Sequence, residues 1–113
     1  MECVFCGIVS GQIPGQIIYR TDLVTAFRDI NPIAPTHALI VPNRHIDSIQ
    51  ELSPEERELA GQLLLGVKEV ARLEGIDESG YRVIINTGSD GHQEVQHLHI
   101  HVVGGRPMHY KIG

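Results

Sequence analysis

Three histidines alternate with apolar residues in the segment His97-Leu98-His99-Ile100-His101-Val102-Val103. Successive side chains of a β-strand point to opposite faces, so this alternation predicts a strand with all three histidines on one face. Neighbours on the same face of a strand lie roughly 6.5–7 Å apart. A single small molecule can therefore contact several of these imidazoles at once.

The length and composition of the chain are typical of one globular domain. The chain has 113 residues, of which 42% are hydrophobic and 20% are charged, so we expect a single domain over residues 1–113 with one core. No apolar run approaches the roughly 20 residues that a membrane helix needs. The N-terminal residues also lack the basic region of a secretory signal. These features favour a cytoplasmic protein with no membrane partner.

The net charge limits the partners that the chain can bind. Its formal value is -5, which argues against broad, salt-driven binding to nucleic acid. A small phosphate ligand remains compatible with this charge, because a few backbone N–H groups and histidine side chains can hold it. We therefore expect no nucleic-acid partner.

The apolar pattern predicts five strands and two helices. A short helix is expected within residues 1–15, and strands over residues 17–19, 24–28, 37–42, 81–86 and 97–103. A long helix is expected from Ser53-Pro54-Glu55-Glu56, which has the residues of a capping box, to Gly75. Its apolar stripe comprises Leu59, Leu63, Val67 and Val70, widened by Leu64, Ala71 and Leu73. Short turns between most strands favour an α+β domain with an antiparallel sheet.

The histidine strand allows three interpretations. A solvent-facing strand is disfavoured, because three histidines on one face are an unusual polar surface. A zinc site is chemically reasonable, since histidines two apart on a strand can ligate zinc, but no nearby carboxylate is available to fix their tautomers. A phosphate site is the third interpretation: one imidazole attacks the phosphorus, and its neighbours donate hydrogen bonds to the phosphate oxygens.

The same segment resembles the signature of the histidine-triad (HIT) superfamily, His-φ-His-φ-His-φ-φ with φ apolar, at every position. The likeness extends to the branch of histidine-triad nucleotide-binding proteins that hydrolyse purine nucleoside phosphoramidates. It is carried by Phe27-Arg28-Asp29-Ile30, Ala34-Pro35-Thr36-His37, Gly80-Tyr81-Arg82, Asn86 and Gly104-Gly105-Arg106-Pro107-Met108. The resemblance implies a HIT-like fold, with a five-stranded antiparallel sheet, one long and one short helix, and pairing of two copies into a homodimer.

The resemblance also implies roles for individual residues. His99 is implied as the nucleophile that takes AMP through Nε2, His101 as a donor to the α-phosphate, and His37 as a further catalytic residue. The implied nucleotide-binding residues are Phe27, Asp29, Ile30, Asn86, His92, Gln93 and Glu94, together with His99 and His101. Asp29 suits the ribose hydroxyls chemically, because a carboxylate accepts hydrogen bonds. Phe27 and Ile30 are equally compatible with positions in the core.

Two residues depart from the pattern of the relatives. Many relatives have Gly-Gly-Gln before the triad, where this chain has Gly91-His92-Gln93. Many also have a serine at the position of Glu94, and that serine is thought to assist the departing amine. A protonated Glu94 can donate a hydrogen bond, whereas an ionised Glu94 repels phosphate. The proton donor for the leaving group is therefore left open.

The pair Cys3-x-x-Cys6 is ambiguous by itself. A redox pair is expected after a strand and at a helix N-terminus, and no strand precedes it here. Some HIT proteins bind zinc through such a pair, a histidine after the third strand and the first triad histidine, and His45 and His97 stand at these positions. A structural zinc and simple packing of two small side chains both remain open. The resemblance implies no cofactor for catalysis.

The resulting hypothesis is a nucleotide-binding hydrolase. It cleaves the P–N bond of purine nucleoside phosphoramidates of the AMP-amine or AMP-lysine type, forms an AMP-histidine intermediate and releases AMP. Two alternatives remain at this point: a non-catalytic nucleotide- or zinc-binding interaction module, and a dinucleoside polyphosphate hydrolase. The module does not need His99 as a nucleophile, which distinguishes it from both enzymes.

Overall fold

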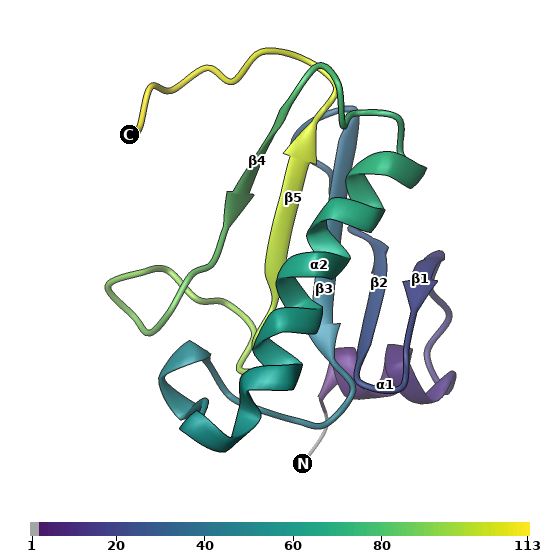
Figure 1. Ribbon diagram of the computed structural model, residues 1–113, viewed down its shortest axis with the longest axis vertical. Helices are drawn as coiled ribbons and strands as arrows, with labels where there is room; N and C mark the ends of the chain where they lie inside the picture. The colour runs from purple at the N-terminus through teal and green to yellow at the C-terminus, as the bar shows by residue number, and fades with distance from the viewer. Residues whose placement is uncertain (1–2) are drawn as a thin grey trace.

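A five-stranded antiparallel sheet forms the centre of the computed structural model, which describes the chain from Cys3 to Gly113 (Figure 1). In chain order the elements are α1 (Val4–Ser10), β1 (Ile17–Arg20), β2 (Val24–Arg28), β3 (Thr36–Pro42), the 3₁₀ helices η1 (Ile49–Glu51) and η2 (Pro54–Glu56), α2 (Arg57–Leu73), β4 (Tyr81–Ile84) and β5 (Ile100–Gly104). The expected α+β fold with one long and one short α-helix is confirmed. No helix in this part of the chain has the length and apolar character needed to cross a membrane.

The strand order β1-β2-β3-β5-β4 places β3 and β5 side by side in the interior of the sheet. The register sets Leu39 of β3 opposite His101 of β5. Two residues further along the pairing, His37 lies opposite Val103. Residues two apart on a strand share a face, and so do directly opposed residues, so His37 and His101 are diagonal neighbours on one face. The sheet thus joins two histidines that are far apart in the sequence.

The two faces of the sheet have different coverings. Helix α2 lies across one face (Figure 1) and packs Leu63, Val67 and Val70 against Ile40 and Ile100. A smaller cluster, which contains Phe5 from α1 with Phe27, Leu39 and Val41, lies apart from this main core. Because Leu39 shares its face with His37 and His101, the histidines lie on the side of α1. The long helix therefore stabilises the sheet without covering its histidines.

The start of the long helix follows the sequence prediction. Ser53 and Glu56 form the predicted capping box, and Pro54 occupies the first turn. That turn is a 3₁₀ helix, and the α-helix proper begins at Arg57. The apolar stripe is narrower than expected, because Leu64 is 63% exposed and Leu73 is 45% exposed. A helix turns by about 100° per residue, so Leu64 faces away from its buried neighbour Leu63.

The histidine strand is shorter than its alternation predicted. We expected a strand over residues 97–103, but β5 runs from Ile100 to Gly104. The segment before it is held differently, because the backbone N–H of Leu98 donates to the carbonyl of Ile46 at 2.6 Å. The pairing with β3 accordingly begins at Ile100, opposite Ile40. His97 and His99 therefore precede the strand, and only His101 lies within it.

Candidate active site

The rings of three histidines gather on the α1 side of the sheet. The ring centroids of His99 and His101 are 5.0 Å apart, and those of His37 and His101 are 5.2 Å apart. His37 and His99 are buried, whereas His101 is partly exposed. The structure thus brings together the three residues that the sequence predicted as catalytic.

The hydrogen bonding of His99 determines which of its nitrogens is nucleophilic. Its Nδ1 lies 2.7 Å from the backbone carbonyl oxygen of His97. A carbonyl only accepts hydrogen bonds, so Nδ1 must carry the proton. In the neutral imidazole the other nitrogen, Nε2, then carries the lone pair. This backbone carbonyl fixes the tautomer in place of the carboxylate that the sequence did not provide.

A second chain of hydrogen bonds fixes the tautomers of His37 and His101. The backbone N–H of Ile33 donates to Nδ1 of His37 at 3.2 Å, so the proton of His37 is on Nε2. That nitrogen lies 2.9 Å from Nδ1 of His101, and it therefore donates to it. The remaining proton of His101 is consequently on Nε2. The two rings form a relay that presents an N–H donor at His101.

The relay is neutral near pH 7. Burial lowers the pKa of His101 to about 4, with further lowering from the nearby His99 and His37. Burial also lowers the pKa of His37, against the opposing effect of Asp29. His101 is therefore a neutral donor in the unliganded protein, and it does not repel a positive charge that develops on His99 as strongly as an imidazolium would.

A cavity of about 590 Å³ lies beside His37. Its lining includes Asp29 and Ile30 from the loop after β2, and Ile30 is 88% exposed. One oxygen of Asp29 accepts the backbone N–H of Asn31 at 2.9 Å, and the other lies 3.4 Å from Nε2 of His37. Phe27 lies elsewhere, because it is 2% exposed within the smaller core cluster. Phe27 and Ile30 were both expected to contact the nucleotide base, but only Ile30 lines this cavity.

The side chains of Asn86 and Gln93 form hydrogen bonds with backbone groups in and next to the loop that precedes the histidines. The side-chain amide of Asn86 donates to the carbonyl of Gly91 at 2.8 Å. Gln93 accepts the N–H of Gly88 at 3.0 Å and donates to the carbonyls of Asp47 and Val95 at 2.7 and 2.9 Å. Both protons of its amide are thus used within the protein. In this structure the two residues shape the loop.

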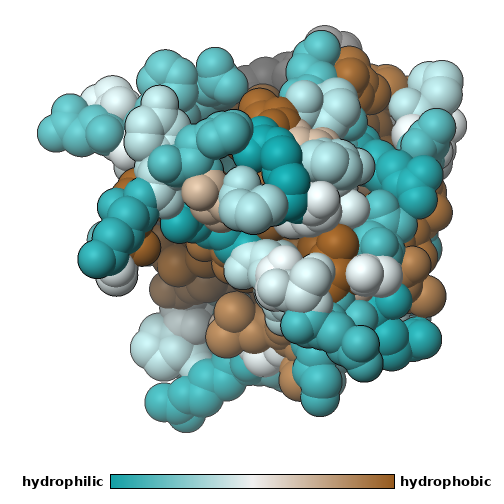
Figure 2. Space-filling view, turned by 90° about the horizontal axis from the view of Figure 1, so that it is seen from above, coloured by the Kyte–Doolittle hydropathy of each residue, from teal (hydrophilic) through white to brown (hydrophobic). Residues whose placement is uncertain are grey.

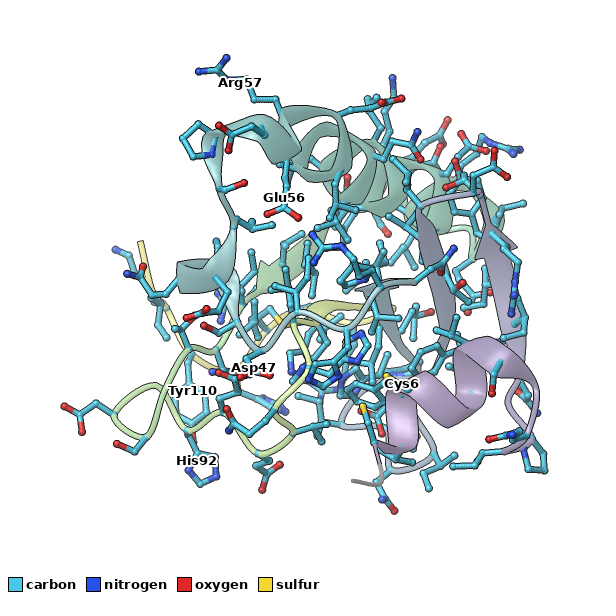
Figure 3. The ribbon with its side chains drawn as sticks, turned by 90° about the horizontal axis from the view of Figure 1, so that it is seen from below. Cys6, Asp47, Glu56, Arg57, His92 and Tyr110 are labelled. Carbon is cyan, nitrogen blue, oxygen red and sulfur yellow. The ribbon has the colours of Figure 1, made fainter. Side chains whose placement is uncertain are left out.

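The two departures from the HIT pattern lie on the solvent side of this loop. His92 has a φ of 62°, a left-handed conformation that favours glycine, which explains why relatives use glycine there. Its side chain points into solvent (Figure 3), 3.6 Å from the exposed carboxylate of Glu94. The structure shows no hydrogen bond between either side chain and the three catalytic candidates.

A four-ligand cluster, made of Cys3, Cys6, His45 and His97, lies next to His99. The potential ligand atoms of these residues all lie within 4.8 Å of one another. Nδ1 of His97 is 3.3 Å from Sγ of Cys3 and 3.5 Å from Sγ of Cys6. Nδ1 of His45 is 3.4 Å from Sγ of Cys6, which projects from the start of α1 (Figure 3). The structure thus collects all four residues that the sequence predicted as metal ligands.

The histidines of the four-ligand cluster are oriented by groups outside it. Nε2 of His97 donates to the carbonyl of Pro42 at 3.0 Å, and Nε2 of His45 donates to Asp47 at 2.8 Å. Both Nδ1 lone pairs therefore face the sulfurs, and metal-binding histidines are commonly supported in this way. The Asp47 hydrogen bond raises the pKa of His45. Burial favours the neutral thiol of Cys3, but hydrogen bonds, first of all from the backbone N–H of Cys6, outweigh it and lower the pKa of Cys3.

A second group, Asp29, His37 and His101, also places potential ligand atoms within 4.8 Å of one another. Its hydrogen bonding is unlike that of a metal site. A ligating histidine usually donates its second nitrogen to an acceptor, whereas Nδ1 of His37 accepts a backbone N–H. This group therefore suits the hydrogen-bonded relay rather than a resident metal.

Phe5 also borders the site, although no sequence pattern predicted it there. Its ring packs edge-on against both His97 and His99, with centroid distances of 5.9 and 5.1 Å. It stands between the two cysteines on α1 and also contacts Phe27 at 5.4 Å. The only signal in the sequence was its position inside the Cys-x-x-Cys segment, which keeps it close to the two cysteines along the chain.

Comparisons with known proteins agree with this geometry. The sequence model of the HIT domain matches residues 10–108. Purine nucleoside phosphoramidase from Escherichia coli K12 is 48% identical over 107 residues, which cover 95% of this chain and 90% of that protein. The crystal structure of a HIT family hydrolase from Legionella pneumophila Philadelphia 1 superposes with a TM-score of 0.93 at 43% identity, covering 99% and 100% of the two chains. A histidine triad protein from Clostridium difficile superposes with a TM-score of 0.90 at 42% identity, covering 98% and 100%.

Proposed function

The chain belongs to the HIT domain family, and from this premise we propose that it is a hydrolase of purine nucleoside phosphoramidates. The observation that carries the proposal is the hydrogen bond from Nδ1 of His99 to the carbonyl of His97, because it leaves a lone pair on Nε2. The donor at His101 stands beside this nucleophile. The similarity to the E. coli phosphoramidase supports the P–N bond as the one that is cleaved.

The first step is an in-line displacement at the α-phosphorus. Nε2 of His99 forms a bond to phosphorus while the bond between phosphorus and the amine nitrogen breaks. The departing nitrogen takes up a proton that comes ultimately from solvent, because a neutral amine is a far better leaving group than an amide anion. The carbonyl of His97 stabilises the positive charge that develops on the His99 ring, and Nε2–H of His101 donates to a phosphate oxygen.

The second step regenerates the enzyme. Water attacks the same phosphorus, a P–O bond forms, and the bond from phosphorus to Nε2 of His99 breaks. AMP leaves, the water loses a proton to solvent, and the lone pair returns to Nε2. The proton on Nδ1 stays in its hydrogen bond throughout, so His99 ends the cycle in its starting tautomer. A histidine nucleophile thus divides one hydrolysis into two displacements.

The cavity beside His37 is the proposed site of the nucleoside. Its volume of about 590 Å³ falls within the range of small-molecule pockets, which is about 300–1,000 Å³. Asp29 can accept hydrogen bonds from ribose hydroxyls, and Ile30 offers an apolar surface to the base. The nucleoside would then lie next to the relay, with its 5′ phosphate toward His101 and His99.

The function is tested by comparing two substrates. We expect the purified protein to hydrolyse an AMP-amine phosphoramidate much faster than a diadenosine polyphosphate, and mass spectrometry of enzyme quenched during turnover to detect AMP on His99. Faster cleavage of the polyphosphate would favour the dinucleoside polyphosphate hydrolase. Absence of turnover and of any adduct would favour the non-catalytic module.

We also propose that the four-ligand cluster binds a structural zinc ion. Tetrahedral bonds of about 2.0–2.3 Å place neighbouring sulfur and nitrogen ligands roughly 3.3–3.8 Å apart. The sulfur–nitrogen distances of 3.3, 3.4 and 3.5 Å agree with this spacing. Four protein ligands leave no open position, so a zinc ion here would act on structure and not directly on the substrate.

Pairing of two copies through β4 is the proposed quaternary structure. β4 is an edge strand of the sheet, and its Tyr81 and Val83 are exposed. Val83 lies opposite Val102, a residue of the α2 core, so it faces the α2 side but is not covered. Leu64 and Leu65 are exposed on α2 itself. Hydrophobic residues also reach the surface among hydrophilic ones in Figure 2.

We expect light scattering to give twice the 12.5 kDa mass of one chain. Val83→Glu should shift the protein toward monomer, because it places a charge in the proposed interface. Ile17→Glu is the matched control, since Ile17 is an exposed apolar residue of the opposite edge strand, β1. A monomeric wild type, or an equal response to both substitutions, would contradict pairing through β4.

A further inference from the structure

We propose that the four-ligand cluster positions the nucleophile, so that metal bound by Cys3, Cys6, His45 and His97 holds the His99 ring in its attacking orientation. The inference rests on the proposed function, because it concerns the same nucleophile and the same zinc site. It assigns these residues a positioning role in the reaction in addition to the structural one. Two separate contacts connect the cluster to His99.

The first connection runs through His97. Its ring presents Nδ1 to the two cysteine sulfurs, at 3.3 and 3.5 Å. Its carbonyl oxygen accepts a hydrogen bond from Nδ1–H of His99, with 2.7 Å between nitrogen and oxygen. One residue thus contributes both a metal ligand and the acceptor that fixes the His99 tautomer. A metal bound at Nδ1 would restrain the position of His97, and through its backbone it would also restrain the direction of this carbonyl.

The second connection runs through Phe5. Its ring contacts His99 edge-on at a centroid distance of 5.1 Å, and it stands on α1 between the two cysteines. Helix α1 has only seven residues, which is too short to be stable without tertiary contacts. Metal bonds to Cys3 and Cys6 would anchor the start of this helix. Without these bonds, α1 would hold the Phe5 ring, against which the His99 ring packs, less firmly.

The contacts inside the four-ligand cluster are too weak to hold His97 and α1 in place without a metal. Without a metal, the two sulfurs and the two Nδ1 atoms meet only through weak hydrogen bonds of a thiol. Metal coordination replaces these contacts with four bonds in a fixed geometry. Mutation of groups that support a site through its neighbours commonly costs about 10–100-fold in activity. We expect an effect at the lower end of this range, because Pro42 also holds His97.

The test compares the 113-residue protein before and after removal of zinc with a chelator, and again after reloading. Metal analysis should find one zinc per chain in the loaded protein. Nitrogen-15 NMR of the histidine rings should show His99 as a single tautomer protonated at Nδ1, and stripping should broaden or average its signals. With an AMP-amine phosphoramidate as substrate, kcat should fall about tenfold while KM changes little, because the nucleoside cavity lies away from the cluster.

A matched pair of variants separates positioning from general loosening of α1. Cys6→Ser should reproduce the NMR and kinetic effects of stripping. Val9→Ala removes packing between the same helix and the smaller core cluster but no metal ligand, and it should retain the His99 tautomer and kcat. Equal kinetic losses in both variants, with the His99 signals unchanged, would overturn the inference.

Two further outcomes would overturn the inference independently of the proposed function. One is a protein that binds no zinc. The other is a protein that binds zinc but whose His99 signals are unchanged on stripping. If the loaded protein binds zinc and shows the NMR change but does not hydrolyse phosphoramidates, the proposed function fails and the coupling of the cluster to His99 stands.

Discussion

His99→Asn is expected to lower kcat for phosphoramidate hydrolysis by about 10⁴-fold or more, which corresponds to roughly 5 kcal/mol of activation free energy. The substitution removes Nε2 and with it the covalent route. The asparagine amide can still donate to the carbonyl of His97, so the hydrogen bond that anchors this position is kept. The measurements are steady-state kinetics, thermal unfolding and a search for the AMP adduct by mass spectrometry.

Leu98→Met is the control for this prediction. Leu98 adjoins His99 but is buried in the core beneath α2. A swap that nearly conserves volume usually costs less than about 1.5 kcal/mol of stability, and kcat should remain close to the wild-type value. Undiminished turnover by His99→Asn would show that another group attacks phosphorus. A comparable loss in Leu98→Met would show that kcat responds to packing and not to the nucleophile.

His37→Phe is expected to lower kcat by about 10²- to 10³-fold while the protein stays folded. Phenylalanine retains a ring of similar size but has neither nitrogen. Nδ1 of His101 then loses its donor, and His101 no longer has a single tautomer that presents N–H to the phosphate. Ring nitrogen shifts of His101, measured together with kcat and KM, report this change directly.

Loss of a buried hydrogen bond also destabilises a protein, by about 1–3 kcal/mol when a polar group is left unpaired. Thr25→Val controls for that effect, since the buried hydroxyl of Thr25 donates to Asn43, the residue that follows the neighbouring strand β3, at 2.6 Å. It should lower the unfolding temperature and leave kcat and the His101 shifts unchanged. A His37→Phe protein with normal kcat would exclude the relay from the reaction.

Much of the fold could be predicted from local patterns. The residues around Ser53 and Glu56 predicted the start of the long helix through hydrogen bonds within four residues of chain, and these hydrogen bonds are present. The start of β5 could not be predicted in this way. It depends on a hydrogen bond from Leu98 to Ile46, two residues that lie far apart in the sequence, and alternation carries no information about that contact.

The candidate site likewise has features that could be predicted from the sequence and features that could not. The alternation singled out the triad, and the HIT resemblance supplied His37 and the four potential metal ligands. The tautomers of His37 and His97 could not be read from the alternation, because they are fixed by backbone groups of Ile33 and Pro42 that have no signature in side-chain pattern. Gln93 was expected to contact phosphate or its surroundings, and in this structure its amide donates to the backbone carbonyls of Asp47 and Val95. The roles of the site residues in binding and catalysis stay predictions.

The opposite coverings of the sheet have a consequence for how this protein can change. Along β5, Ile100 and Val102 pack into the core beneath α2. His101, between them in the sequence, points to the opposite face, where its ring meets His37. Substitutions beneath α2 should therefore alter the unfolding temperature with little effect on the choice of substrate. On the other face, substitutions of exposed residues that line the cavity, such as Ile30, should alter substrate choice with little effect on the unfolding temperature. Thermostability and specificity can thus be engineered as nearly independent traits when the two substitutions lie on opposite faces of the sheet.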